Sequence, residues 1–247
     1  MIEQKTQVLT AHGTAEAIVY SPGEDGRWPG VILYTDIGGI RASQEQMARR
    51  LAGVGYVVLM PNIFYRTSAL PLLDFPKKFG EERTMKRLAE LTGPLTREAI
   101  LDDASDYVDF LAQHNSVKSG PMGVVGYCFS GKMALYTALS RPDKIAAAAT
   151  FHAGGLATDA PDSPHFALES SLTARLYFGH ATNDKSMPAE AIEKLNHALA
   201  AWGGKYESEV YDGAFHSWTV PDSPVYNQPQ AERAFEKLTN LFAETLT

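Results

Sequence analysis

The sequence predicts an α/β fold in which a mostly parallel central sheet is flanked by helices on both faces. Short apolar runs alternate with helical patterns along the chain, which is typical of such a sheet. The 247 residues, 45% of them hydrophobic, are enough for one large core. No linker, repeat or low-complexity run divides the chain, so we expect one domain that spans residues 1–247.

The elements are expected in the following order. Residues 7–9 and 15–20 should form an initial hairpin, and further strands are expected at 31–34, 56–60, 122–125, 145–150, 175–178 and 206–211. Helices are expected at 43–52, 81–91, 97–114, 129–140, 188–202 and 230–245. Ser43, with Gln46 three residues later, matches a capping box, and Thr96 is expected to cap the third helix. We interpret residues 62–95 as an excursion over one face of the sheet that shapes a pocket.

Composition excludes several classes of partner and cofactor. The formal net charge is -7, with acids and bases interspersed, whereas a nucleic-acid binder needs clustered Lys and Arg. No apolar run approaches the roughly 20 residues that span a bilayer, and no signal peptide is evident, so a cytoplasmic protein is expected. The single cysteine, Cys128, excludes an internal disulfide and a thiolate-rich metal site. We expect no metal, no organic cofactor, and a monomer or small homo-oligomer.

A predicted strand passes directly into a predicted helix at residues 124–131, which read Val-Val-Gly-Tyr-Cys-Phe-Ser-Gly. A nucleophile elbow needs this arrangement, with small residues two before and two after the nucleophile. Gly126 and Ser130 occupy those positions around Cys128, although glycine is usual where Ser130 stands. A helix N-terminus favours a thiolate, and the Phe129 N–H would face a developing oxyanion. The alternative is a structural cysteine; Ser130 as nucleophile is rejected, because Lys132 would then occupy a small position.

The elbow predicts an α/β-hydrolase fold, in which the acid and then the histidine follow the nucleophile along the chain. His216 comes after the last predicted strand, where this fold places its base. Asp184 follows the preceding strand, and Asp212 is a runner-up that lies too close to His216 in sequence. The remaining histidines after the elbow are His152, His165, His180 and His197. Of these, His152 and His180 end predicted strands and are candidates for lining the pocket.

Several segments resemble the dienelactone hydrolases, or carboxymethylenebutenolidase-like proteins, over nearly the whole chain. They are Gly126-Tyr127-Cys128, the Asn183-Asp184 loop that ends at Pro188, residues 213–218 (Gly-Ala-Phe-His-Ser-Trp) and residues 61–66 (Pro-Asn-Ile-Phe-Tyr-Arg). The resemblance implies a catalytic triad of Cys128, Asp184 and His216. It also implies a second oxyanion donor on the loop of residues 35–39, where the candidate is the N–H of Ile37.

The substrate-binding positions depart from the family pattern. Family members carry on that loop a glutamate that takes part in thiol activation, and Asp36 stands here. They hold the lactone carboxylate with arginines, one of them four residues beyond the catalytic histidine, where this chain has Val220. The other corresponds to Arg83, with Arg87 as an alternative. A less charged ester or lactone than dienelactone is therefore expected, in a pocket whose candidate apolar walls are Phe64, Tyr65, Tyr127 and Trp218.

These residues predict a hydrolase that works by two-step acyl transfer. His216 would draw the proton from Cys128, and the thiolate would attack an ester or lactone carbonyl. One alternative is a thioesterase or a hydrolase of activated phosphate esters on the same scaffold. Another alternative is a non-catalytic binding or redox-sensing protein that has kept the elbow.

Overall fold

The computed structural model describes residues 1–75, 78 and 80–247, and its eight strands form one sheet. The strand order is β1-β2-β4-β3-β5-β6-β7-β8. β1 and β2 pair antiparallel with each other, β2 pairs antiparallel with β4, and the pairs from β4 through β3 to β8 are parallel. The strands are β1 (Ile2–Thr10), β2 (Gly13–Ser21), β3 (Gly30–Tyr34), β4 (Val57–Pro61), β5 (Met122–Tyr127), β6 (Ile145–Phe151), β7 (Arg175–Asn183) and β8 (Tyr206–Phe215). The predicted α/β fold with a mostly parallel sheet is confirmed.

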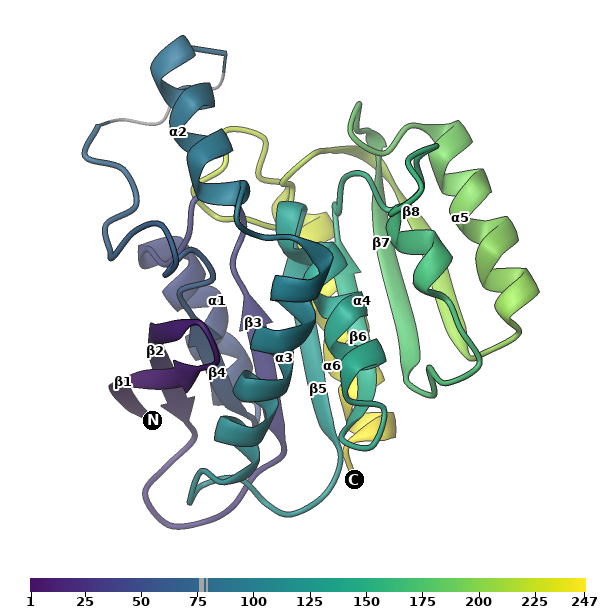
Figure 1. Cartoon of the computed structure of the whole chain (residues 1–247). Coiled ribbons are helices and arrows are strands. Elements are labelled where there is room, and N and C mark those ends of the chain that lie inside the picture. Colours follow the sequence, from purple (N-terminus) through teal and green to yellow (C-terminus); the bar gives the residue numbers. More distant parts are fainter. Residues whose placement is uncertain (76–77, 79) are drawn as a thin grey trace.

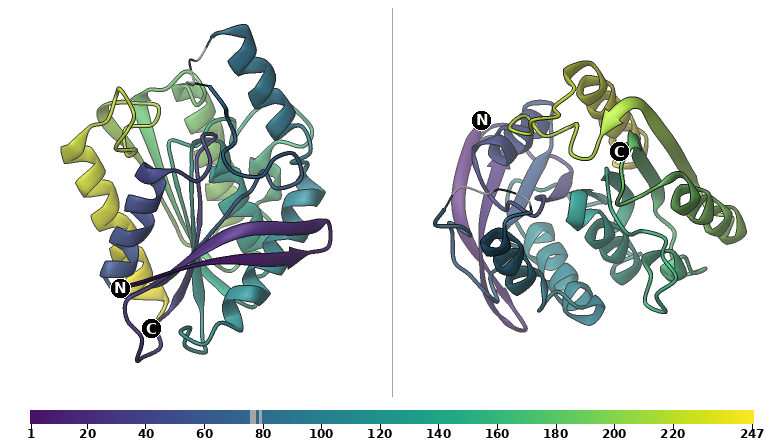
Figure 2. Two further views of the ribbon diagram at one scale, coloured as in Figure 1. Left: turned by 90° about the vertical axis from the view of Figure 1, so that its left-hand side faces the viewer. Right: turned by 90° about the horizontal axis from the view of Figure 1, so that it is seen from above.

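Helices cover both faces of this sheet (Figures 1 and 2). One face carries α1 (Ala42–Gly53) and α6 (Gln228–Thr245), whose apolar residues form one core with that face. The opposite face carries α3 (Arg97–Ala112), α4 (Gly131–Ser140) and α5 (Ala189–Trp202), which form the second core. The remaining helix, α2 (Glu82–Thr92), projects at one end of the sheet within the predicted excursion (Figure 1). Residues 76, 77 and 79 of that excursion lie outside the described residues.

Two helix N-termini test whether the local sequence determines where a helix begins. Thr96 caps α3 as predicted, because its side chain accepts a hydrogen bond of 3.2 Å from the Ala99 N–H. The capping box at Ser43 is not formed. α1 begins at Ala42, the extended Arg41 is the N-cap residue, and Ser43 is buried inside the helix.

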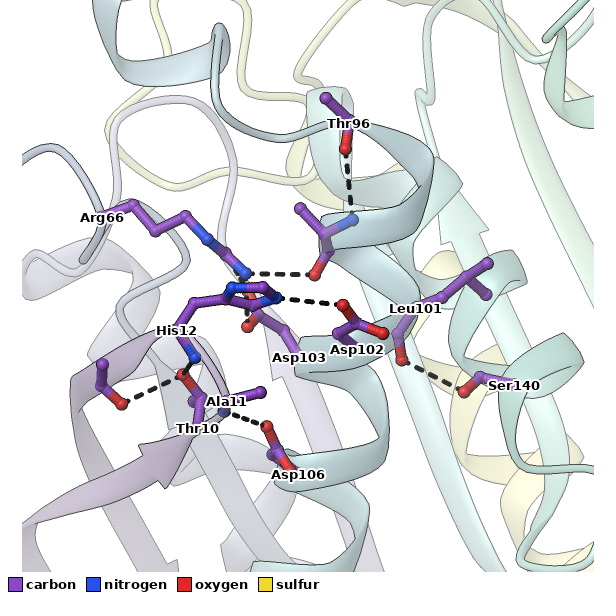
Figure 3. A network of polar contacts seen from close by, with 12 residues as sticks. Thr10, Ala11, His12, Arg66, Thr96, Leu101, Asp102, Asp103, Asp106 and Ser140 are labelled. Atoms are coloured by element: carbon purple, nitrogen blue, oxygen red, sulfur yellow. Dashed lines mark hydrogen bonds and ion pairs between the residues drawn. The ribbon is translucent and has the colours of Figure 1, made fainter.

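The excursion after β4 is fixed to α3 by buried charges (Figure 3). Asp103 on α3 is 1% exposed and binds both Nη atoms of Arg66, with a length of 2.9 Å for the Nη2–Oδ1 contact. The Tyr65 hydroxyl donates to the same carboxylate at 2.7 Å. In the adjoining hairpin, the His12 Nε2 lies 3.0 Å from the Asp102 carboxylate. Tyr65, a candidate pocket wall, therefore directs its polar end to α3.

β7 and β8 extend further than predicted. β7 continues to Asn183, and β8 continues through Asp212–Ala214, expected as a turn, to Phe215. The pairing register of the two strands shifts between Ala181 and Asn183, which indicates a bulge. Asp184 and His216 consequently follow directly upon two neighbouring strand ends. Because β3 and β5 run parallel to β7 and β8, their following loops reach the same edge of the sheet.

Candidate active site

The cysteine lies on a tight, strained bend between β5 and α4. Cys128 has a backbone φ of 57°, in the left-handed region that non-glycine residues rarely adopt. A Cβ atom on Gly126 would lie 2.3 Å from the Ser130 carbonyl oxygen, and one on Gly131 would lie 2.2 Å from the Ala153 Cβ. Both positions therefore need glycine. The bend leaves the side chain of Cys128 partly exposed at the end of the strand.

Hydrogen bonds of Ser130 stabilise this bend. Its hydroxyl oxygen accepts the Tyr127 N–H at 3.0 Å, and its own proton can be donated to the carbonyl of Tyr34 or of Tyr127, each at 3.0 Å. The residue is fully buried. A serine at this position therefore holds β3, β5 and the elbow together through hydrogen bonds, and its oxygen has no access to a ligand.

A histidine and an aspartate are aligned with the sulfur. The His216 Nε2 lies 3.0 Å from the Cys128 Sγ, and the His216 Nδ1 lies 2.7 Å from the Asp184 Oδ2. The other oxygen of Asp184 accepts two hydrogen bonds from Ser186, from Oγ at 2.6 Å and from the backbone N–H at 2.8 Å. The Ser186 Oγ also lies 3.1 Å from the His216 Nδ1. The structure thus brings together the three residues predicted as a triad and adds Ser186, for which the sequence carries no signal.

These contacts determine the charge of the imidazole. Burial alone would lower the pKa of His216, but the hydrogen bonds with Asp184 and Cys128 outweigh it and raise the pKa to about 10. Burial would raise the pKa of Asp184, but hydrogen bonds from His216 and Ser186 lower it. At neutral pH the site therefore holds an ionised carboxylate and an imidazolium, and the imidazolium can donate its Nε2 proton to the sulfur.

A second histidine supports the first. The rings of His152 and His216 meet edge to face with centroids 5.4 Å apart, and the His152 Nε2 lies 2.7 Å from the Thr219 Oγ1. Burial, together with the nearby His216, lowers the pKa of His152 well below its ordinary value, so this ring stays neutral. The His152 ring also meets Trp218, with centroids 5.1 Å apart, and Trp218 is 0% exposed. Trp218 therefore belongs to the core behind the two histidines and presents no surface to a ligand.

The two predicted oxyanion donors lie on the loops that flank the sulfur. Ile37 follows β3 and Phe129 follows Cys128, and both residues are partly exposed. Within the described part of the chain, neither backbone N–H donates to a protein acceptor. An oxyanion donor needs an N–H that is not already bonded within the protein, and both groups meet this condition.

Three other predicted site residues have their main contacts away from the sulfur. The Asp36 carboxylate is bound by Arg41, by Gln44 and by the Gly38 N–H, so its hydrogen bonds are directed away from the thiol. Arg83 is 66% exposed and pairs with Asp74 at 3.1 Å. Tyr127 stacks on Phe151 with ring centroids 5.7 Å apart, and lines a cavity of about 220 Å³ between α1 and α6. The sequence does not indicate these contacts, because they depend on how each element packs against its neighbours.

A cysteine at a strand–helix elbow, aligned with a histidine and an aspartate from the last two strand ends, defines an α/β-hydrolase. Comparison with known proteins identifies the family within this class. The sequence profile of the dienelactone hydrolase family matches residues 15–246. A Salmonella typhi protein, provisionally named a carboxymethylenebutenolidase, is 26% identical over 222 residues, covering 89% of this chain and 78% of the relative. A carboxymethylenebutenolidase of Rhodococcus opacus is 25% identical over 236 residues, covering 93% and 86%.

Solved structures resemble this chain over nearly its whole length. A Klebsiella pneumoniae protein, provisionally named a dienelactone hydrolase, superposes with a TM-score of 0.86 at 21% identity, covering 98% of each chain. A dienelactone hydrolase-like promiscuous phosphotriesterase from metagenomic libraries has a TM-score of 0.79 at 19% identity, covering 100% of this chain and 99% of the other. The chain belongs to the dienelactone hydrolase family and is a carboxylic ester hydrolase.

Two further features can be stated for the described residues. No group of three or more His, Cys, Asp or Glu side chains within them is arranged to hold a metal ion. No helix among them combines the length and the apolar character that a membrane span requires.

Proposed function

We propose that the protein hydrolyses small esters or lactones through a covalent acyl-cysteine intermediate, with Cys128 as nucleophile, His216 as base and Asp184 as the group that orients His216. One observation carries the proposal: the His216 imidazole is bound at one nitrogen by Asp184 at 2.7 Å and faces the Cys128 sulfur with the other at 3.0 Å. This chain of contacts fixes both the ring orientation and the direction of proton transfer.

In the first step the Cys128 proton is transferred to His216, and the resulting thiolate attacks the substrate carbonyl carbon and forms a C–S bond. The carbonyl oxygen becomes an oxyanion, which the N–H groups of Ile37 and Phe129 stabilise. The tetrahedral intermediate then collapses, the C–O bond of the ester breaks, and the leaving alkoxide takes the proton from the His216 imidazolium. The products of this step are an alcohol and a thioester on Cys128.

In the second step neutral His216 takes a proton from water, and the resulting hydroxide attacks the thioester carbonyl. The C–S bond breaks, the acid is released, and the thiolate–imidazolium pair is restored. Thiolate leaves readily from a tetrahedral intermediate, so esters and lactones suit this chemistry better than amides do.

We further propose that residues 1–247 act as one domain, since all eight strands share one sheet.

The test is a comparison of the parent protein with Cys128→Ala on p-nitrophenyl acetate. The parent should show turnover, and intact-mass spectrometry after rapid acid quench should show one acetyl group on the protein. The variant should show neither. Because Cys128 is the only cysteine, pretreatment with iodoacetamide should alkylate one thiol and abolish turnover in parallel. Hydrolysis by Cys128→Ala at the parental rate would overturn the proposal, and stoichiometric alkylation without any turnover by the parent would favour a thiol-based sensor.

A further inference from the structure

The Asp184 carboxylate is held at both of its oxygens, one by His216 and the other by Ser186. The Asp184 Oδ2 lies 2.7 Å from the His216 Nδ1. The Asp184 Oδ1 accepts the Ser186 backbone N–H at 2.8 Å and lies 2.6 Å from the Ser186 Oγ. An ionised carboxylate can only accept hydrogen bonds, so the Ser186 hydroxyl is the donor in this last contact. The single proton of the hydroxyl is therefore committed to Asp184.

The same hydroxyl also contacts the imidazole. The Ser186 Oγ lies 3.1 Å from the His216 Nδ1. Because its proton is used by Asp184, this oxygen can only accept a hydrogen bond from the ring nitrogen. The His216 Nδ1 thus faces two acceptors, the Asp184 Oδ2 and the Ser186 Oγ. Both contacts keep a proton on Nδ1 and leave Nε2 to exchange protons with Cys128.

The segment after β6 fixes the position of Ser186. The Ser186 carbonyl accepts the Gly155 N–H at 2.9 Å. A Cβ atom on Gly154 would lie 2.7 Å from the Ser186 Oγ and 2.8 Å from the Ser186 Cβ, so the glycine packs directly against this side chain. His152, whose ring meets that of His216, lies two residues before Gly154. Residues 152–155 therefore contact both the imidazole and the hydroxyl that accepts from it.

The turn from Asp184 to Met187 does not itself need the hydroxyl. It is closed by two backbone donors, the Ser186 N–H on the Asp184 side chain at 2.8 Å and the Met187 N–H on the Asp184 carbonyl at 3.2 Å. An alanine at position 186 would keep both hydrogen bonds, and the residue is exposed. Within the described chain the hydroxyl bonds only to Asp184 and His216, so its effect is confined to these two residues.

We propose that Ser186 is a positioning residue of the triad, whose hydroxyl fixes the orientation of the Asp184 carboxylate and keeps a proton on the His216 Nδ1 in both steps of the reaction. The inference rests on the proposed function and adds a fourth residue to it. His216 must take the Cys128 proton on Nε2 in the first step, and a proton from water on the same atom in the second. A neutral ring with its proton on Nε2 could do neither.

The test compares the parent protein with Ser186→Ala on p-nitrophenyl acetate. In the variant, kcat/KM should fall by about tenfold, as expected for the loss of one hydrogen bond to a charged group, and the urea midpoint should be unchanged. In the Asp184→Asn background the same substitution should cost less than about twofold, because the carboxylate through which the hydroxyl acts is gone. The matched control is Ser119→Ala, which should retain the parental kcat/KM. Ser119 is exposed and precedes β5, at the end of that strand away from the elbow.

A pH profile of kcat/KM separates positioning of the triad from support of the fold. Burial would raise the pKa of Asp184, and hydrogen bonds from His216 and Ser186 lower it. Removal of the hydroxyl should therefore raise this pKa, so that on acidification kcat/KM of Ser186→Ala begins to fall at a higher pH than that of the parent. The other titratable groups that interact with Asp184, namely His152, His180 and His216, are present in both proteins.

Three outcomes would overturn the inference and leave the proposed function intact. One is a parental kcat/KM in Ser186→Ala, and another is an equal loss in the parent and Asp184→Asn backgrounds. The third is a loss that accompanies a lower urea midpoint and an unshifted acid limb of the pH profile, which would assign Ser186 to the fold alone. Hydrolysis that persists at the parental rate in Cys128→Ala would overturn the proposed function, and this inference with it.

Discussion

Asp184→Asn tests how the carboxylate controls the imidazole. The substitution keeps the size of a side chain that is 5% exposed, so the fold should be retained. One oxygen of Asp184 accepts two hydrogen bonds from Ser186, and one of these comes from a backbone N–H, which can only donate. The amide oxygen of the asparagine must therefore face Ser186, and its NH₂ group must face the His216 Nδ1.

The magnitude follows from this orientation. A hydrogen bond between charged groups contributes about 1.5–3 kcal/mol, which alone corresponds to roughly a 10- to 150-fold loss in kcat/KM. In addition, the NH₂ group makes the His216 Nδ1 an acceptor and so places the ring proton on Nε2. In that tautomer the imidazole cannot take the Cys128 proton. We therefore expect a loss of at least about 100-fold, together with a fall in the pKa of His216 from about 10.

Two measurements check this expectation. Steady-state hydrolysis of p-nitrophenyl acetate gives kcat/KM, and an NMR titration of the ring Cε1–H gives the pKa of His216. Asp212→Asn is the matched control, because Asp212 is four residues from His216 in sequence and its side chain is exposed. The control should stay within about twofold of the parent, as exposed substitutions usually do. An Asp184→Asn enzyme with more than half of the parental kcat/KM, or an equal loss in the control, would refute the reasoning.

Three further expectations concern stability. Gly126→Ala should lower the free energy of unfolding by about 1–3 kcal/mol in urea denaturation, because the new Cβ meets the Ser130 backbone; an unchanged midpoint would contradict this. Asp103→Asn should cost about 3–5 kcal/mol in the same assay, because it leaves the largely buried Arg66 charge without its carboxylate; a loss below about 1 kcal/mol would show that the pair is well solvated. The pKa of His216 is about 10 when folded against 6.5 ordinarily, so its stabilising contribution is complete below pH 6.5 and is lost as pH rises through 10. Parent and His216→Phe stabilities should therefore converge across that interval, and a constant difference would exclude the linkage.

The parts of the site that depend on local backbone geometry were predictable from the sequence. The elbow needs two close approaches that only small residues allow, and these requirements are visible as Gly126 and Gly131 around Cys128. Asp184 and His216 were predictable because the topology fixes which strand ends lie beside the nucleophile. Their strands were predicted too short, yet the order of the elements was sufficient to select both residues.

The parts that depend on tertiary packing were not predictable. Tyr127 and Trp218 are large aromatic residues next to triad positions, and whether such a side chain enters the cavity or the core depends on strand twist and on the bulge between β7 and β8. Arg41 is similar: the capping pattern at Ser43 fails, and α1 begins at Ala42, with Arg41 extended and bound to two carboxylates. One of those carboxylates is Asp222, 181 residues away along the chain, and no local pattern indicates the contact.

Residues with strained backbone conformations gather at this edge of the sheet, which supports the proposal that the edge is functional. In the described chain, three non-glycine residues have a positive φ: Cys128 at 57°, His152 at 43° and Ser217 at 74°. Each such conformation costs of the order of 1–3 kcal/mol. One carries the sulfur, one meets the imidazole edge to face, and one directly follows His216. A glycine would relieve the strain at each position, but at Cys128 it would remove the sulfur and at His152 the ring that meets His216. Stability is therefore lowered at two positions, Cys128 and His152, where the proposed chemistry needs a fixed side chain.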